Sequence, residues 1–148
     1  MSLKLQRSPQ NSCLPTSFAM CCDITVSKFI NQSGVQGNSV VWEDLPHPYC
    51  IRGWHLQECI ITAYKNGYAT TVLSPKIYLG PDSEHLTEID MDFHLVNKRA
   101  VLISDKHAVA LECKRVYDPK GYIYDYENLK DYEIICLIDK INGQSNEP

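Results

Sequence analysis

Five short strand-like segments follow one another in the C-terminal third of the chain, and this feature constrains the fold most. Each segment is apolar or alternates between apolar and polar residues, and turn-like residues separate it from the next. The segments cover residues 100–104, 107–111, 115–117, 122–126 and 132–138. Helical periodicity occurs earlier in the chain. Because helices come first and strands later, without alternation between them, we expect an α+β domain.

An apolar stripe at helical spacing runs through residues 15–32. Steps of four, four, three and one residues place its members on one helix face; they are Phe18, Cys22, Val26, Phe29 and Ile30. Pro15 is tolerated only in a first turn, where its missing N–H would be unpaired anyway, so the helix is predicted to begin near residues 12–14. Gly34 provides a natural stop.

The middle of the chain is less regular. A second helix is predicted over residues 54–66, closed by Gly67 in the C-cap position. Strands are predicted at residues 69–73 and 77–79. Residues 34–53 are rich in Gly and Pro and are predicted to form mostly loop.

Length and composition describe one globular domain. The chain has 148 residues with 44% apolar and 22% charged residues, so we expect a single domain over residues 1–142 and a loose tail over 143–148. Fourteen basic and 18 acidic residues give a net charge of −4, and no Lys/Arg run exceeds two, which disfavours a nucleic-acid surface. No apolar stretch approaches the roughly 20 residues that cross a bilayer, and no signal-type segment opens the chain. We therefore expect a cytoplasmic protein without a membrane partner.

The seven cysteines direct attention to thiol chemistry. Their number is odd and no Cys-x-x-Cys occurs, so we expect reduced thiols, most of them small buried hydrophobic residues. Cys13 differs because it lies at the predicted first turn of a buried helix. Unpaired N–H groups and the helix dipole favour the thiolate there, and the N–H of Cys13 can help to hold an oxyanion. The alternative is a buried cysteine that happens to precede a helix.

A resemblance supports the reactive interpretation of Cys13. The run Cys-Leu-Pro-Thr-Ser-Phe-Ala-Met resembles the nucleophile helix of papain-like cysteine peptidases, in particular the bacteriocin-leader (double-glycine) branch and its stand-alone relatives. Leu14 departs from the pattern, since the family usually has Gly there. The resemblance implies a papain-like fold, with the N-terminal nucleophile helix packed on a C-terminal antiparallel sheet. It also implies a peptide or protein substrate and no cofactor.

His107 and Asp118 are the predicted base and its orienting carboxylate. His107 heads a strand, so its imidazole is expected to be rigid but reachable. If the chain reverses around residues 112–113, His107 and Asp118 stand directly opposite with their side chains on one face. The family likewise has a His-x-Val strand followed by Asp-Pro. The alternative is a type I turn over residues 118–121, in which the Asp118 carboxylate caps backbone N–H groups.

An oxyanion donor is expected to precede the nucleophile in the chain. The family has a Gln about six residues before the Cys. Gln6 lies seven residues before Cys13 and Gln10 lies three before, so Gln6 is the candidate. A surface glutamine without a catalytic role is the alternative.

Other constellations compete with this site. His47, Cys50, His55 and Cys59 have spacings that can converge on zinc, although burial of Cys59 in the core is favoured. The segment Asp90-Met91-Asp92-Phe93-His94 is expected to be solvated. A recognition surface and ordinary strand packing are both compatible with five tyrosines, and packing is preferred; these are Tyr117, Tyr122, Tyr124, Tyr126 and Tyr132.

The sequence therefore predicts a cysteine peptidase-like hydrolase, or an acyl transferase, that acts on a peptide or isopeptide bond through Cys13, His107 and Asp118. The alternative is a non-catalytic binding module on the same scaffold. Three features favour that alternative: Leu14, the spacing of Gln6, and the turn at residues 112–113, which lacks the Gly or Asn of tight hairpins.

Overall fold

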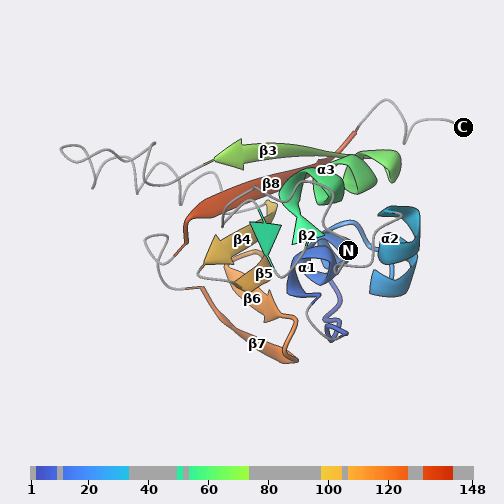
Figure 1. The fold of residues 1–148 in the computed structure, drawn as a ribbon. Coiled ribbons are helices and arrows are strands. Elements are labelled where there is room, and N and C mark those ends of the chain that lie inside the picture. The colour runs from blue at the N-terminus through green and yellow to red at the C-terminus, as the bar shows by residue number, and fades with distance from the viewer. Residues whose placement is uncertain are drawn as a thin grey trace, which may run out of the picture.

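The computed structural model describes residues 3–9, 12–33, 50–51, 54–73, 98–104, 107–126 and 132–141. These residues form three helices, a two-stranded sheet and a six-stranded sheet (Figure 1). The helices are α1 (Cys13–Cys21), α2 (Val26–Ser33) and α3 (Leu56–Lys65). The strands are β1 (Cys50–Ile51), β2 (Trp54–His55), β3 (Tyr68–Leu73), β4 (Arg99–Ser104), β5 (His107–Glu112), β6 (Arg115–Asp118), β7 (Tyr122–Asp125) and β8 (Ile134–Lys140). The predicted α+β class is confirmed.

The larger sheet is antiparallel throughout and has the strand order β3-β8-β4-β5-β6-β7. The five C-terminal strands and the strand predicted at 69–73 are confirmed to within a few residues at their ends. β8, which comes last, inserts between β3 and β4 and so joins the middle of the chain to its C-terminal third. The strand predicted at 77–79 lies outside the described residues.

The single helix predicted through residues 15–32 is wrong, because α1 and α2 are separate helices bent by 109°. Asp23 adopts a left-handed backbone with φ 58°, and the Thr25 hydroxyl accepts a hydrogen bond from the N–H of Lys28 at 3.2 Å as an N-cap. The apolar stripe continues across the break, since the rings of Phe18 and Phe29 lie 6.2 Å apart. Periodicity alone therefore does not reveal the bend.

The second predicted helix is present as α3, and Gly67 follows it with φ 87°, as a helix C-terminus requires. Its predicted first two residues instead form β2, which pairs with β1. Residues 34–49 and 52–53 of the predicted loop lie outside the described residues. Within the described part of the chain, no single helix is long and apolar enough to cross a membrane.

The helices cover one face of the sheet. α1 packs against β5 and β4, and both α2 and α3 pack against α1. Every residue of α1 is buried, so this helix is the centre of the main core. A second apolar cluster consists of Ala100, Leu102, Val109, Leu111, Val116 and Ile135. Its β5 members alternate with Ala108 and Ala110 of the main core, and therefore point to the opposite face of the sheet.

Candidate active site

Cys13 is the first residue of α1 and is 7% exposed. Pro15 lies in the first turn, where no helical N–H is required of it. The Thr16 hydroxyl donates to the Ser12 carbonyl at 2.6 Å, and the Ser17 hydroxyl donates to the Cys13 carbonyl at 2.8 Å. Both hydroxyls are fully buried and satisfied within the helix. The Pro-Thr-Ser run thus builds a rigid first turn beneath Cys13.

Leu14, the residue that departs from the family pattern, has no exposed surface and belongs to the main core. Its side chain therefore contributes to anchoring the start of α1. It does not project from the molecular surface beside Cys13.

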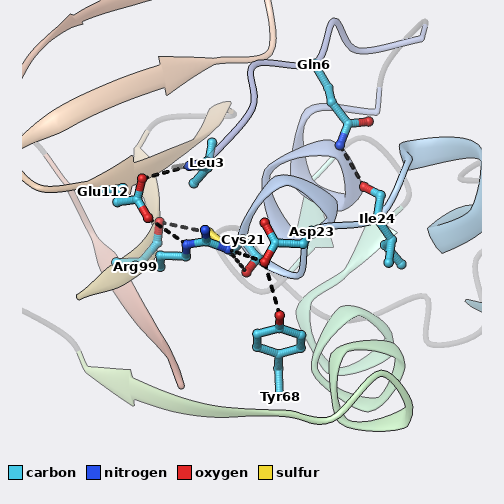
Figure 2. A network of polar contacts seen from close by, with 9 residues as sticks. Leu3, Gln6, Cys21, Asp23, Ile24, Tyr68, Arg99 and Glu112 are labelled. Carbon is cyan, nitrogen blue, oxygen red and sulfur yellow. Dashed lines mark hydrogen bonds and ion pairs between the residues drawn. The ribbon is translucent and has the colours of Figure 1, made fainter. Parts of the chain in front are cut away.

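Contacts at the other end of α1 determine which way the helix runs along the sheet. Arg99 donates to the Cys21 carbonyl at 3.0 Å, and the Cys21 thiol donates to the Ala100 carbonyl at 3.4 Å (Figure 2). Arg99 is also paired with Glu112, the last residue of β5. The C-terminal end of α1 thus lies at the Glu112 end of β5. α1 packs on the face of β5 that carries Ala108 and Ala110, whereas His107, the first residue of β5, has the strand parity of Val109 on the other face.

His107 and Asp118 lie in direct contact at this end of the sheet. The Nε2 atom of His107 is 2.9 Å from Oδ1 of Asp118, and the two side chains are 24% and 9% exposed. A carboxylate in that position accepts a hydrogen bond from Nε2–H and favours the tautomer whose Nδ1 carries a lone pair. Nδ1 is thus the ring nitrogen available to accept a proton.

The hairpin between β5 and β6 closes by a tighter turn than its residues suggest. Glu112 pairs directly with Arg115, which leaves only Cys113 and Lys114 in the turn. Both have positive φ, 52° and 62°, as a type I′ turn requires. Neither residue is the Gly or Asn that usually occupies such positions.

This turn shifts the predicted register by two residues. Ala110 pairs with Tyr117, so Asp118 does not stand directly opposite His107 as predicted but lies on the diagonal. A shift of two residues keeps each side chain on its original face, whereas a shift of one would reverse it. The predicted register is wrong, yet the predicted pair of residues is in contact.

The Asp118 carboxylate performs both of the roles that the sequence left open. Its Oδ1 also accepts the N–H of Lys120 at 2.9 Å, and the Asp118 carbonyl accepts the N–H of Gly121 at 2.8 Å. The turn that follows β6 therefore holds the carboxylate in place while it contacts His107. The segment before α1 also reaches this turn, because the N–H of Ser8 donates to the Pro119 carbonyl at 2.8 Å.

Tyr124 is a contributor that the sequence reasoning missed. Its hydroxyl donates to Oδ2 of Asp118 at 3.3 Å. Burial and the nearby charge of Asp118 raise the pKa of Tyr124 to about 12, so the phenol remains a donor at neutral pH. The pairing of β6 with β7 could have predicted this contact. Tyr124 pairs with Val116, which lies two residues from Asp118, so Tyr124 and Asp118 share one face of the sheet.

Gln6 makes a structural contact instead of facing Cys13. Its Nε2 donates to the Ile24 carbonyl at 2.7 Å (Figure 2). Its Oε1 accepts the N–H of Val26 at 2.8 Å. These bonds clamp the connection between α1 and α2, at the end of α1 away from Cys13. In this structure Gln6 therefore does not supply the predicted oxyanion donor. Gln10 lies outside the described residues.

The zinc constellation is only partly described. Cys59 is buried in the main core, as favoured, and His55 is fully buried with Nδ1 3.4 Å from Oε1 of Glu58. His47 and the side chain of Cys50 lie outside the described residues, as does the 90–94 segment. The described residues contain no group of three or more His, Cys, Asp or Glu side chains placed to hold a metal.

Four other thiols are held in their protonated form by the core. Burial raises the pKa of Cys22 and Cys136 to about 12 and also raises the pKa of Cys21 and Cys59. Cys113, in the hairpin turn, is exposed. Any thiol-labelling experiment on Cys13 must therefore account for Cys113.

Of the five tyrosines considered above, some pack against apolar residues and the others are exposed. Tyr117 is buried, and Tyr126 and Tyr132 pack against the second apolar cluster, as strand packing predicts. Tyr122 and Tyr124 on β7 are largely exposed.

Comparison of the chain with protein-family models and with curated proteins finds no match. The resemblance to papain-like peptidases is therefore carried by the Cys13–Met20 run and by the chain order of Cys13, His107 and Asp118.

Proposed function

We propose that this protein is a thiol-dependent hydrolase or acyl transferase of the papain-like type, acting on a peptide or isopeptide bond. The observation that carries the proposal is the 2.9 Å contact between His107 and Asp118, in a domain whose buried helix α1 begins at Cys13. A nucleophilic thiol, an imidazole base and an orienting carboxylate are the three groups that such a reaction requires.

Each residue has a defined part in the reaction. His107 takes the Cys13 proton at Nδ1, and the thiolate attacks the acyl carbon. When the C–N bond breaks, the amine leaves with that proton from the imidazolium, and a thioester remains on Cys13. Water, deprotonated by His107, then attacks the thioester, releases the acid and returns the proton to the sulfur. In a transferase, an amine takes the place of water.

The first turn of α1 supplies the electrostatic support for this reaction. In this scheme, the N–H of Cys13 and the positive end of the α1 dipole stabilise the negative charge that develops on the acyl oxygen. Asp118 stabilises the imidazolium and is itself held by the Lys120 N–H and the Tyr124 hydroxyl. Gln6 has no part in this scheme, since its amide binds the connection after α1.

The second candidate is a non-catalytic binding module on the same scaffold. The engagement of the Gln6 side chain favours it, because the family's oxyanion glutamine then has no counterpart among the described residues. The two candidates differ in the reactivity of Cys13, since a binding module does not need an activated thiol.

The test measures the rate of Cys13 alkylation by iodoacetamide as a function of pH. The parent carries Cys113→Asn and Cys50→Ser, so that the exposed turn thiol and a second cysteine do not contribute. We expect a half-maximal rate well below the ordinary thiol pKa of about 8.5, and no modification in Cys13→Ala. Incubation with p-nitrophenyl acetate should then give an acetyl thioester on Cys13 that water removes.

Two results bear against the proposal. Equal labelling of the parent and Cys13→Ala removes Cys13 from its role. A Cys13 that reacts only above pH 8.5 and forms no acetyl thioester favours the binding module. Circular dichroism of Cys13→Ala checks that the fold is retained.

A further inference from the structure

Strand β7 is one edge of the six-stranded sheet, and its outer side pairs with no strand in the described part of the chain (Figure 1). All four of its residues are exposed. Tyr122, Ile123 and Tyr124 are 62%, 48% and 44% exposed, so three large apolar side chains follow one another at this edge. Edge strands usually carry Lys or Pro, which prevent pairing with another chain, and these three positions carry neither.

The backbone of β7 alternates between groups that bind β6 and groups that face outward. Tyr126, in register just beyond β7, donates its N–H to the Lys114 carbonyl at 2.8 Å, which makes these two residues a hydrogen-bonded pair. Such pairs alternate along an antiparallel ladder, so Tyr124 also bonds to β6, whereas Ile123 and Asp125 do not. The N–H and C=O groups of Ile123 and Asp125 therefore point away from β6. They offer two donors and two acceptors to an added strand.

Exposed positive charge flanks this edge. Lys114 and Lys120 lie in the turns before and after β6, are exposed, and form no ion pair with the residues that the structure describes. Arg115 stands opposite Asp125, so these two charges offset each other. The Asp118 carboxylate is mostly buried. In a chain of net charge −4, the two ends of the edge are thus locally positive.

The short length of β7 indicates what this edge can hold. A stable protein–protein interface uses roughly 20–30 residues on each side, far more than a strand of four residues provides, which disfavours a second copy of this chain. An extended peptide needs only main-chain hydrogen bonds and contacts from alternate side chains. On one face those side chains meet the rings of Tyr122 and Tyr124, against which aromatic and β-branched residues pack well.

We propose that the β7 edge binds an extended peptide of a partner protein by strand addition, and that this peptide has an apolar centre flanked by acidic residues. The outward backbone groups of Ile123 and Asp125 pair with its main chain. The tyrosine rings contact its apolar side chains, and the lysines of the two turns attract its acidic ones. This inference goes beyond the proposed function, because it does not require Cys13 to react.

The experiment measures binding of a fluorescein-labelled peptide, Glu-Glu-Val-Thr-Val-Thr-Glu-Glu, by fluorescence anisotropy at about 20 mM salt. We expect Ile123→Pro to weaken binding about tenfold, because it removes an outward N–H and leaves the bonds to β6 in place. The same peptide with Lys in place of Glu should bind at least about fivefold more weakly, and about 0.5 M salt should remove most of that difference.

Val72→Pro is the matched control, because it makes the same change at the opposite edge of the sheet. Ile141 donates its N–H to the Gly67 carbonyl at 2.8 Å, so the same alternation turns the N–H of Val72 on β3 outward. Val72 is 42% exposed, close to the value for Ile123. We expect Val72→Pro to bind the peptide as the unsubstituted protein does. Equal weakening by the two substitutions overturns the inference.

N-methylated peptides test main-chain pairing without a change in the protein. In an added strand, alternate N–H groups face β7 and the others face solvent, so methylation of one set should abolish binding and methylation of the other should not. Equal effects of the two methylation patterns overturn the inference, whether or not Ile123→Pro folds. Two further results also overturn it: no binding by the unsubstituted protein at up to about 1 mM, and a dimer in sedimentation that Ile123→Pro dissociates.

Discussion

The polar groups around Arg99 and those around His107 act in opposite ways. At the C-terminal end of α1, Arg99 contacts Asp23 and Glu112 at 2.8 Å each and the Cys21 carbonyl at 3.0 Å (Figure 2). Burial opposes the Arg99 charge, but hydrogen bonds to Glu112 and Asp23 outweigh burial and raise its pKa. Glu112 also accepts the N–H of Leu3 at 2.8 Å. The described polar groups there are satisfied by one another.

The His107–Asp118 pair retains a group that can act on another molecule. The His107 side chain is a quarter exposed and is oriented from one nitrogen by Asp118. The difference indicates that the contacts of Arg99 anchor the fold, whereas the proposed chemistry depends on His107. Substitutions at the two places should therefore separate stability from reactivity.

The largest effect is expected from His107→Ala. Without the imidazole, the alkylation rate of Cys13 at about pH 6 should fall roughly 100-fold, because no base holds the thiol ionised. The midpoint of urea unfolding should change little, since the side chain lies at a strand end. If the rate is unchanged, His107 is not the partner of Cys13.

Arg99→Met, in contrast to His107→Ala, should lower the stability of the protein. It leaves Asp23 and Glu112 without their cation, and we expect the free energy of unfolding to fall by about 2–4 kcal/mol, since Glu112 is mostly buried but Asp23 is partly exposed. Urea denaturation measures this change. Lys98→Met is the control, because the Lys98–Asp139 pair is 45% exposed on each side and should contribute under about 1 kcal/mol. Equal effects of the two variants would contradict the anchoring role of Arg99.

Alkaline pH should reveal the thiols that the core keeps protonated. The pKa of Cys136 is about 12 in the folded protein and near 9 when unfolded, so between these values the folded state binds more protons. Stability should therefore fall as pH rises above about 9, by up to roughly 1.4 kcal/mol per pH unit from this one thiol. Urea titrations under reducing conditions should give a shallower slope for Cys136→Ala. Cys113→Asn, which removes an exposed thiol, should not alter the slope.

Gln6→Ala tests whether Gln6 stabilises the connection between α1 and α2 or supplies the oxyanion donor. Loss of its two hydrogen bonds to the α1–α2 connection should reduce the free energy of unfolding by about 1–2 kcal/mol. The rate of Cys13 acylation by p-nitrophenyl acetate should stay within about twofold of the parent. A large fall in that rate with unchanged stability would instead make Gln6 the oxyanion donor.

The smallest effect is expected in the turn that sets the β5–β6 register. Asn and Gly adopt positive φ more easily than Cys113 and Lys114, so the double substitution Cys113→Asn, Lys114→Gly should stabilise the protein by about 0.5–1 kcal/mol. The urea midpoint should rise without a change in slope. Destabilisation would mean that the native side chains make contacts worth more than the strain.

Alternation and periodicity predicted most elements because each is a local property of the chain. The helix bend escaped prediction, since the stripe through Phe18 and Phe29 is the same on both sides of it. Its causes, the left-handed Asp23 and the N-cap Thr25, occupy only the few residues of the break.

The candidate site was predicted in part because strand parity tolerates a register error of two residues. His107 and Asp118 remain on one face in either register. Gln6 was misplaced because spacing along the chain does not reveal which backbone groups lie beside it. Arg99 was not predicted, because its partners come together only once α1 is packed on the sheet.

The most direct measurement of the central claim is the thiolate absorbance near 240 nm at about pH 6, where an ordinary thiol is protonated. If Cys13 and His107 form a pair, the protein contains close to one thiolate per chain at this pH, and either Cys13→Ala or His107→Ala abolishes the signal. A parent without thiolate absorbance until the pH exceeds about 8.5 would contradict the account.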